Sequence, residues 1–151
     1  MLVLEEAQDL NAAALEELRL LTCARADTQS PFSLILVGDH DLLPRLELGI
    51  NRALVSRLGF CLHLEAWPLS SLSQYLLERL AEVGIHASPL EPSAHELLLQ
   101  SAAGLPRTLN LLVQRAFEAA AFAQRPQVTR ADIQSALDTL PWIARDRSAP
   151  R

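Results

Sequence analysis

The sequence predicts an α/β layer, part of a parallel sheet, followed by a small all-α bundle. Short apolar runs at 2–4, 32–37 and 60–64 have the length and composition of strands buried in a parallel sheet. Helical patterns separate these runs, which is typical of α/β proteins. After Trp67-Pro68 no strand pattern follows, and amphipathic helical spacing continues to a stop signal at Pro141.

Composition limits the classes of protein that fit. The chain has 151 residues, 50% of them apolar, which is enough for one domain or two small ones. A formal charge of −5 and a pI near 5.3 argue against a protein that grips nucleic acid by bulk electrostatics. Cys23 and Cys61 stand in apolar surroundings without a CxxC motif, so we expect reduced core residues of a cytoplasmic protein. The first residues lack a signal-peptide pattern and no apolar run approaches the roughly 20 residues that span a bilayer, so we expect neither a signal peptide nor a membrane span.

The first strand runs directly into two adjacent carboxylates, Glu5 and Glu6. Ligands of parallel sheets bind at the carboxyl edge, where these residues stand. Successive strand side chains point to opposite sides, so one acid can face a Mg²⁺ ion and the other an attacking water. This division is typical of the Walker B element of P-loop ATPases. The alternative is a strand followed by an acidic helix start, which the helix dipole favours.

The next elements bring more polar groups to the same edge. Asn11 is a good N-cap for a helix to about Thr22, and the polar stretch 27–31 predicts a loop. The second strand ends at Gly38, and Asp39 follows at its carboxyl end. Two strands that deliver polar groups to one edge favour a nucleotide site.

The remaining signals divide the chain into domains. We expect helices at 42–48 and 50–58 before the third strand, and then helices at about 70–83, 93–103, 107–124 and 128–140. Ser93-Ala-His-Glu96 has the pattern of a capping box. We assign 1–66 to the α/β domain, 67–143 to the helical domain and 144–151 to a flexible tail.

A P-loop is absent from the sequence. It would need a glycine-rich turn and a lysine for the β and γ phosphates, and every basic side chain here is arginine. If Glu5 and Glu6 form a Walker B pair, we expect this chain to be the second part of an ATPase and to be inactive alone.

Several stretches, taken together, resemble the ExeA/TniB-like AAA+ ATPases over about residues 1–140. They are Leu2-Val-Leu-Glu-Glu-Ala-Gln-Asp-Leu10, Leu15-Glu-Glu-Leu-Arg-Leu-Leu21, Ser30-Pro-Phe32, Leu34-Ile-Leu-Val-Gly38, Ser56-Arg-Leu58 and Gly104-Leu-Pro-Arg-Thr-Leu-Asn110. The resemblance implies the C-terminal half of a nucleotide-binding α/β domain with its helical lid. It also implies an ATP- and Mg²⁺-dependent homo-oligomer.

The resemblance carries roles to five residues. Glu5 stands where the family usually has the Asp that holds Mg²⁺ through water, and Glu6 where it has the Glu that polarises the attacking water. Asp39 matches the first sensor and Arg107 the second sensor on the lid. Arg57 matches the arginine finger, which reaches the γ-phosphate bound by a neighbouring subunit.

Two of these positions depart from the family pattern. Glu5 is one methylene longer than Asp, and Mg²⁺ demands near-ideal octahedral geometry. Asp39 brings a negative charge near phosphates, where relatives often carry an uncharged polar group. For Arg57 the alternative is a helix C-terminal arginine that meets the dipole, whereas Arg107 at a helix start conflicts with the dipole unless an anion docks there.

Three hypotheses follow for the whole protein. The first is an ATP-dependent DNA transposition helper that works with a transposase and DNA. The second is a secretion-pathway ATPase of the ExeA type; the lack of a membrane span after the helical part favours the first over it. The third is a non-enzymatic remnant that acts in oligomerisation, with exposed sheet edges that pair with another chain.

Overall fold

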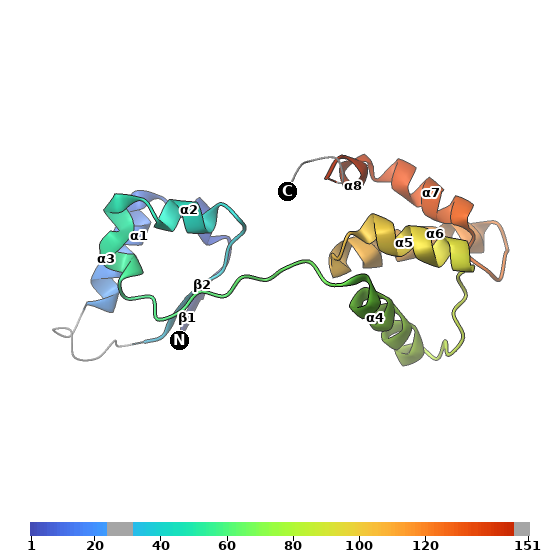
Figure 1. The fold of residues 1–151 in the computed structure, drawn as a ribbon, viewed down its shortest axis with the longest axis horizontal. Coiled ribbons are helices and arrows are strands. Elements are labelled where there is room, and N and C mark those ends of the chain that lie inside the picture. Colours follow the sequence, from blue (N-terminus) through green and yellow to red (C-terminus); the bar gives the residue numbers. More distant parts are fainter. Residues whose placement is uncertain (24–31, 147–151) are drawn as a thin grey trace. The chain divides into compact units, whose positions relative to one another are not determined.

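The computed structural model describes residues 1–23 and 32–146 and divides the chain into two compact units. Unit 1 is Met1–His63 and unit 2 is Leu64–Arg151, and each is described by itself (Figure 1). The predicted loop at 27–31 lies outside the described residues.

Unit 1 is built around a parallel pair of short strands. In chain order its elements are β1 (Leu2–Leu4), the 3₁₀ helix η1 (Ala7–Asp9), α1 (Ala12–Thr22), β2 (Leu34–Leu36), α2 (Leu42–Leu46), the 3₁₀ helix η2 (Gly49–Asn51) and α3 (Arg52–Val55). Leu2 lies opposite Leu34 and Leu4 opposite Leu36 in the ladder. Asn11 caps α1, since its side-chain oxygen accepts the Ala14 N–H at 2.8 Å. The predicted α/β class with parallel strands is confirmed.

One face of this sheet is packed, and the other is open within the described residues. The packed face carries half-buried leucines over a small core made of Ala7, Leu15, Leu18, Leu42, Leu46 and Leu54. On the other face Val3 is 44% exposed and Ile35 is 43% exposed. The prediction that both faces are buried is therefore wrong for this chain, because the helices of unit 1 cover one face only.

The third predicted strand, 60–64, is not a strand in the structure. Phe60, Leu62 and Leu64 are 82%, 70% and 84% exposed. A strand needs a neighbour for its backbone hydrogen bonds, and the described residues offer this segment none. The prediction that both cysteines lie in the core fails as well, since Cys61 is exposed and Cys23 is only half-buried.

Unit 2 is a helical bundle with the larger core. Its helices are α4 (Leu69–Glu82), α5 (Pro92–Ala102), α6 (Pro106–Phe122), α7 (Arg130–Thr139) and α8 (Pro141–Asp146). α6 packs against both α5 and α7, and Leu98, Leu109, Leu112 and Ile133 are fully buried between them. The predicted helical bundle is confirmed. Pro141 begins α8, which reaches into the segment predicted as a tail.

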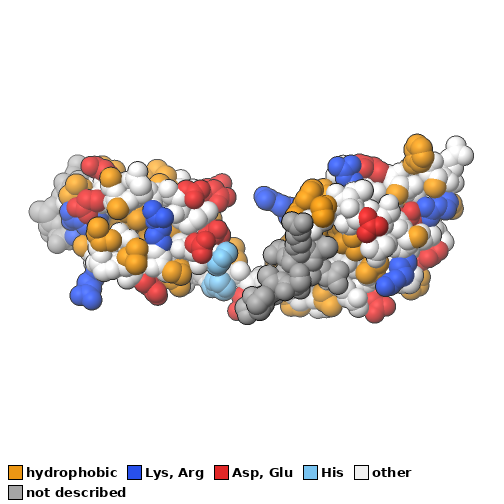
Figure 2. Space-filling view, turned by 90° about the horizontal axis from the view of Figure 1, so that it is seen from above, with side chains coloured by type: hydrophobic (Ala, Val, Ile, Leu, Met, Phe, Trp, Pro, Cys, Tyr) orange, Lys and Arg blue, Asp and Glu red, His pale blue; other side chains and the backbone are white. Residues whose placement is uncertain are grey.

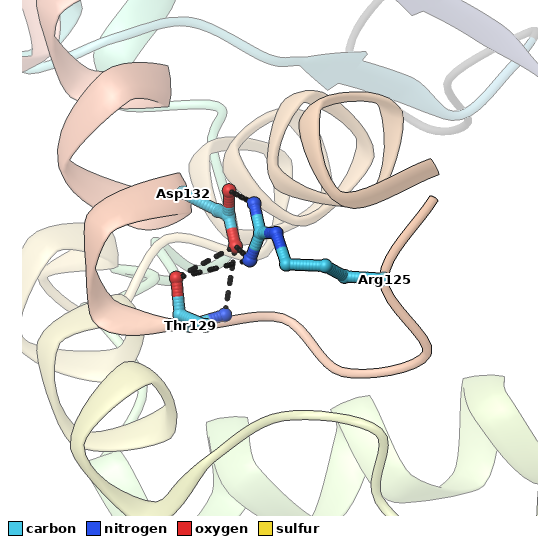
Figure 3. A network of polar contacts seen from close by, with 3 residues as sticks. All are labelled: Arg125, Thr129 and Asp132. Carbon is cyan, nitrogen blue, oxygen red and sulfur yellow. Dashed lines mark hydrogen bonds and ion pairs between the residues drawn. The ribbon is translucent and has the colours of Figure 1, made fainter. Parts of the chain in front are cut away.

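An ion pair between the exposed Arg125 and the buried Asp132 fixes the start of α7 (Figure 3). Arg125 donates two hydrogen bonds to Asp132, at 2.6 and 2.8 Å, and Asp132 accepts the backbone N–H and the hydroxyl of Thr129, both at 2.8 Å. The bonds from Arg125 and Thr129 hold the pKa of the Asp132 carboxyl well below its usual range. The capping box of the bundle thus lies at Thr129, and the one predicted at Ser93 is wrong, because α5 begins at Pro92 with no side-chain cap.

Candidate functional site

The carboxyl edge of the two strands holds three of the predicted residues. The backbone ladder continues beyond both strands, since Val37 N–H donates to Leu4 O at 2.8 Å and Ala7 N–H donates to Val37 O at 2.9 Å. Glu5 and Glu6 leave β1 at this edge, and Asp39 leaves β2 two residues after Val37. Both carboxylates after β1 are exposed to solvent.

The backbone of Glu6 departs from the extended conformation. Its φ of 52° lies in the left-handed region, and its carbonyl accepts the Asp9 N–H at 2.9 Å as η1 begins. Strand alternation predicts that Glu5 and Glu6 point to opposite sides of a continuing strand. In the structure a sharp turn at Glu6, not strand alternation, sets the direction of its carboxylate. Non-glycine residues adopt this backbone region at a cost, and such strain concentrates at functional sites.

Gln8 joins the two halves of the edge. Its Nε2 donates to Glu6 Oε2 at 2.7 Å, and its Oε1 accepts the backbone N–H of Asp39 at 3.3 Å. Glu6 and Asp39 are therefore linked through one side chain. The sequence alone assigns no role to Gln8, which stands within one of the motifs that carry the family resemblance.

Asp39 also shapes its own loop. Its Oδ1 accepts the Asp41 N–H at 2.9 Å, and its carbonyl accepts the Leu42 N–H at 3.2 Å. This Asx turn leads the chain into α2. The carboxylate of Asp39 thus has a structural task in addition to the predicted sensor role.

Arg57 lies in a turn that follows α3. Its backbone N–H donates to Leu54 O at 2.9 Å, and its side chain is exposed. The predicted helix to residue 58 ends at Val55, so Arg57 is not in a helical last turn. Arg45, in contrast, is bound within unit 1, since its guanidinium donates to the carbonyl of Leu10.

Arg107 stands at the second position of α6 in unit 2, after Pro106 at the first. Its side chain is exposed at the positive end of the helix dipole. Gly104, just before it, has a φ of +82°, and its carbonyl accepts the Trp67 N–H at 2.9 Å. A Cβ at Gly104 would lie 2.6 Å from Trp67 O. The segment at Trp67 is thereby held against the start of α6.

Trp67 is anchored inside the helical unit. Its ring meets Tyr75 edge-on, with ring centroids 5.7 Å apart, and the Tyr75 hydroxyl accepts a hydrogen bond from Asn110 at 2.9 Å. Tyr75 is on α4 and Asn110 is on α6, so this contact ties both helices to the segment before α4. Arg107 belongs to unit 2, whereas Glu5, Glu6 and Asp39 belong to unit 1.

The surfaces of both units carry mixed charge. On the face drawn in Figure 2, arginines stand singly among acidic and apolar side chains and form no continuous basic surface. Across 1–23 and 32–146, no group of three or more His, Cys, Asp or Glu side chains is arranged to hold a metal ion. None of the helices in these ranges combines the length and apolar character that a membrane crossing requires.

The donors at the carboxyl edge fit one part of a Mg²⁺·ATP complex. Carboxylate oxygens such as those of Glu5 and Glu6 are ligands that Mg²⁺ accepts directly or through water. Phosphates need cations or a cradle of backbone N–H groups, and this edge carries carboxylates instead. The described part of this edge therefore fits the metal and water side of such a site and not its phosphate side.

Comparison with solved structures places this fold within a known class. The Thermotoga maritima RuvB Holliday junction branch migration motor matches 91% of this chain with a TM-score of 0.67 at 19% identity, and the chain covers 43% of that motor. A point mutant of the same motor matches with a TM-score of 0.63 at 17% identity, again over 91% of this chain and over 44% of its own. The chain has part of the fold of an AAA+ ATPase.

A curated relative narrows the resemblance. General secretion pathway protein A of Aeromonas hydrophila is 29% identical over 136 residues, which are 90% of this chain. The chain spans 25% of the length of that relative. No family model matches the sequence. The resemblance to ExeA-type ATPases is confirmed. This chain is homologous to the secretion protein over 90% of the chain's own length.

This result favours the secretion hypothesis over the transposition hypothesis. The preference for the transposition hypothesis rests on the absence of a membrane span after the helical part. That argument has no force for a chain that corresponds to one quarter of its relative, because the remaining length lies outside the comparison.

Proposed function

We propose that this chain forms the Walker B, sensor and lid portion of an AAA+ ATPase of the secretion-pathway type. The observation that carries the proposal is the shared carboxyl edge of β1 and β2. There Glu5 and Glu6 follow one strand, Asp39 follows the other, and Gln8 joins the two sides with hydrogen bonds of 2.7 and 3.3 Å. The homology to general secretion pathway protein A supports the same assignment.

In this proposal each residue acts through the charge and position that it already has. Glu6 orients and polarises the attacking water, and Glu5 holds a water of the Mg²⁺ shell. Mg²⁺·ATP, when bound, supplies the γ-phosphate that is transferred to water. Asp39 contacts the nucleotide side of the edge while it keeps its Asx turn.

The two arginines contribute positive charge that the edge lacks. Arg57 reaches the neighbouring subunit of a homo-oligomer, and Arg107 senses the γ-phosphate from the lid. The position of Arg107 supports this role, because a cation at a helix N-terminus is unfavourable without an anion nearby. Both arginine side chains are exposed. They could therefore contact a bound phosphate without any rearrangement of the buried core.

The proposed ATPase activity is tested with the protein encoded by the longest reading frame that contains this chain, by measuring its rate of ATP hydrolysis. Glu6→Gln and Arg57→Ala should each lower kcat by about 10³-fold, on the scale known for arginine fingers. Arg52→Ala is the matched control, since Arg52 is also exposed and lies five residues before Arg57. It should stay within about 2-fold of the wild type. Equal losses for Arg52→Ala and Arg57→Ala would remove the finger assignment.

A mixing experiment separates a trans finger from a cis role. Oligomers mixed from Glu6→Gln and Arg57→Ala subunits form some interfaces with an intact Glu6 on one side and an intact Arg57 on the other. Mixing should therefore restore part of the activity that both pure variants lack. No recovery, with mixed oligomers confirmed by mass spectrometry, would place Arg57 outside the neighbouring site.

The biological part is tested by gene disruption. Loss of the gene in its source organism should reduce export of a secreted enzyme reporter, and wild-type protein but not Glu6→Gln should restore it. If export is unchanged while transposition frequency falls, the transposition hypothesis replaces the secretion hypothesis.

A further inference from the structure

Gln8 is the one side chain that contacts both sides of the carboxyl edge in the described part of unit 1. Its backbone is fixed, because it lies in η1 directly after Ala7, which is fully buried and bonded to Val37 O at 2.9 Å. A half-buried side chain with an anchored backbone has few directions available. The amide of Gln8 is therefore presented to this edge by the fold itself.

The two ends of the amide are chemically distinct and both are used. The backbone N–H of Asp39 is a donor, so it requires the carbonyl oxygen of the amide, and the NH₂ group then faces the Glu6 carboxylate. A flipped amide would place its NH₂ against the Asp39 N–H and its oxygen against a carboxylate. The two hydrogen bonds thus select one orientation of the Gln8 amide. Through it they connect the Glu6 carboxylate to the backbone N–H of Asp39.

The opposite strand leaves room for this arrangement at Gly38. A Cβ on Gly38 would lie 2.7 Å from Gln8 Oε1, closer than carbon and oxygen approach in proteins. It would also lie 2.8 Å from a methyl carbon of Leu42. Because Gly38 has no side chain, the Gln8 amide can occupy the space that a Cβ at this position would need.

We propose that Gln8 is a positioning residue that sets the direction of the Glu6 carboxylate and couples it to the loop at Asp39. The proposal rests on the function proposed above, in which Glu6 polarises water and Asp39 contacts the nucleotide side. A change in the loop at Asp39 moves the Gln8 amide, and the amide moves the carboxylate that orients water. The hydrogen bonds supply the coupling, and Gln8 itself touches no reacting atom.

Amide chemical shifts of this 151-residue chain test the coupling without nucleotide. Glu6→Gln should shift the Asp39 amide resonance in the wild-type background. In the Gln8→Met background, which keeps length but removes both polar atoms, the same change should leave that resonance in place. Glu5→Gln is the control, since no hydrogen bond links Glu5 to Gln8 in the described structure, and its effect at Asp39 should be equal in both backgrounds. An Asp39 response to Glu6→Gln that persists with Gln8→Met would overturn the proposal.

Kinetics of the longer ATPase test the consequence. Gln8→Met should lower kcat by about 10-fold and leave KM for ATP within about 2-fold, because a misdirected carboxylate affects the chemical step and not nucleotide affinity. Gln8→Glu keeps an acceptor for the Asp39 N–H but repels Glu6, so it should lower kcat as well. A lower melting temperature of Gln8→Met together with a raised KM for ATP would indicate that Gln8 has a purely structural role, and would refute the positioning role.

The outcomes distinguish this proposal from the proposed function. A wild-type protein that hydrolyses no ATP refutes the ATPase function, whereas the chemical-shift experiment still decides whether Gln8 couples Glu6 to Asp39. A wild type that hydrolyses ATP, with Gln8→Met at the same kcat, refutes the positioning role and leaves the ATPase function standing.

Discussion

Gly104→Ala should destabilise the helical unit far more than a glycine substitution at a comparable backbone angle. Gly104 has a φ of +82°, and Gly84, which follows α4, has a φ of +83°. An added Cβ at Gly84 would meet nothing within 4 Å. At Gly104 it would lie 2.6 Å from Trp67 O, 2.8 Å from Ala66 Cβ and 2.9 Å from Trp67 N. The two glycines therefore share the conformational cost and differ in the steric one.

The magnitudes follow from this difference. Alanine in the left-handed region costs about 1–2 kcal/mol at either position. At Gly104 the overlap with backbone atoms adds about 1–3 kcal/mol of strain, and relief of that strain weakens the Trp67–Gly104 hydrogen bond, worth about 1 kcal/mol. Together these contributions give about 3–6 kcal/mol for Gly104→Ala, against about 1–2 kcal/mol for Gly84→Ala. The unfolded-state effect of Gly→Ala is the same in both variants and cancels in the comparison.

Urea unfolding followed by tryptophan fluorescence measures this difference. Both tryptophans, Trp67 and Trp142, belong to unit 2, so the signal reports the helical unit. The urea midpoint of Gly104→Ala should fall well below that of Gly84→Ala, and the slope of the free energy of unfolding against urea concentration should be unchanged. Equal midpoints for the two variants would refute the inference that Trp67 is held against the start of α6.

Three further predictions concern other parts of the chain. Asp132→Asn should destabilise the helical unit by about 1–3 kcal/mol at pH 7. Since the pKa of Asp132 is lowered by folding, its contribution is present above the unfolded-state pKa and is lost as pH falls through the folded one, so the two unfolding curves should converge in acid. Glu6→Gly should be more stable than Glu6→Ala by about 1 kcal/mol in thermal unfolding, because glycine adopts the positive φ without strain; equal stability would contradict the strain at Glu6. Ile35→Lys should reduce self-association of the chain in sedimentation, because it charges the open sheet face, whereas Val83→Lys on unit 2 should have no such effect.

The sequence predicted local elements well where one segment decides its own structure. The apolar run at Leu2 to Leu4 followed by carboxylates gave the first strand and its acidic edge, and Asn11 marked the start of α1. In the structure Pro92 and Pro106 each begin a helix, one residue before the predicted starts at 93 and 107, because the fixed φ and missing N–H of proline suit a first turn. Pro141 was assigned as a stop, but it begins α8, since the same property that ends one helix can begin the next.

Prediction failed where a structure depends on a distant neighbour. Residues 60–64 have the length and apolar composition of a strand, yet a strand forms only beside a partner that supplies backbone hydrogen bonds. The role of Gln8 was invisible for the same reason, since its contact with Asp39 spans 31 positions of the sequence. A usable signal was the glycine at the end of the second strand, which indicates a close approach without naming the partner.

The motif Gly104-Leu-Pro-Arg107 shows how packing and chemistry can share four residues. Gly104 admits the Trp67 backbone, Pro106 begins α6, and Arg107 stands one residue further on, where the helix dipole disfavours a cation. The glycine and the proline have complete explanations in the folding of the helical unit. The arginine does not, because its side chain is exposed and its charge is unfavourable at the positive end of the helix dipole. The structural residues of the motif therefore fix the backbone from which Arg107 extends, and an anion such as a phosphate is the partner that would make its position favourable.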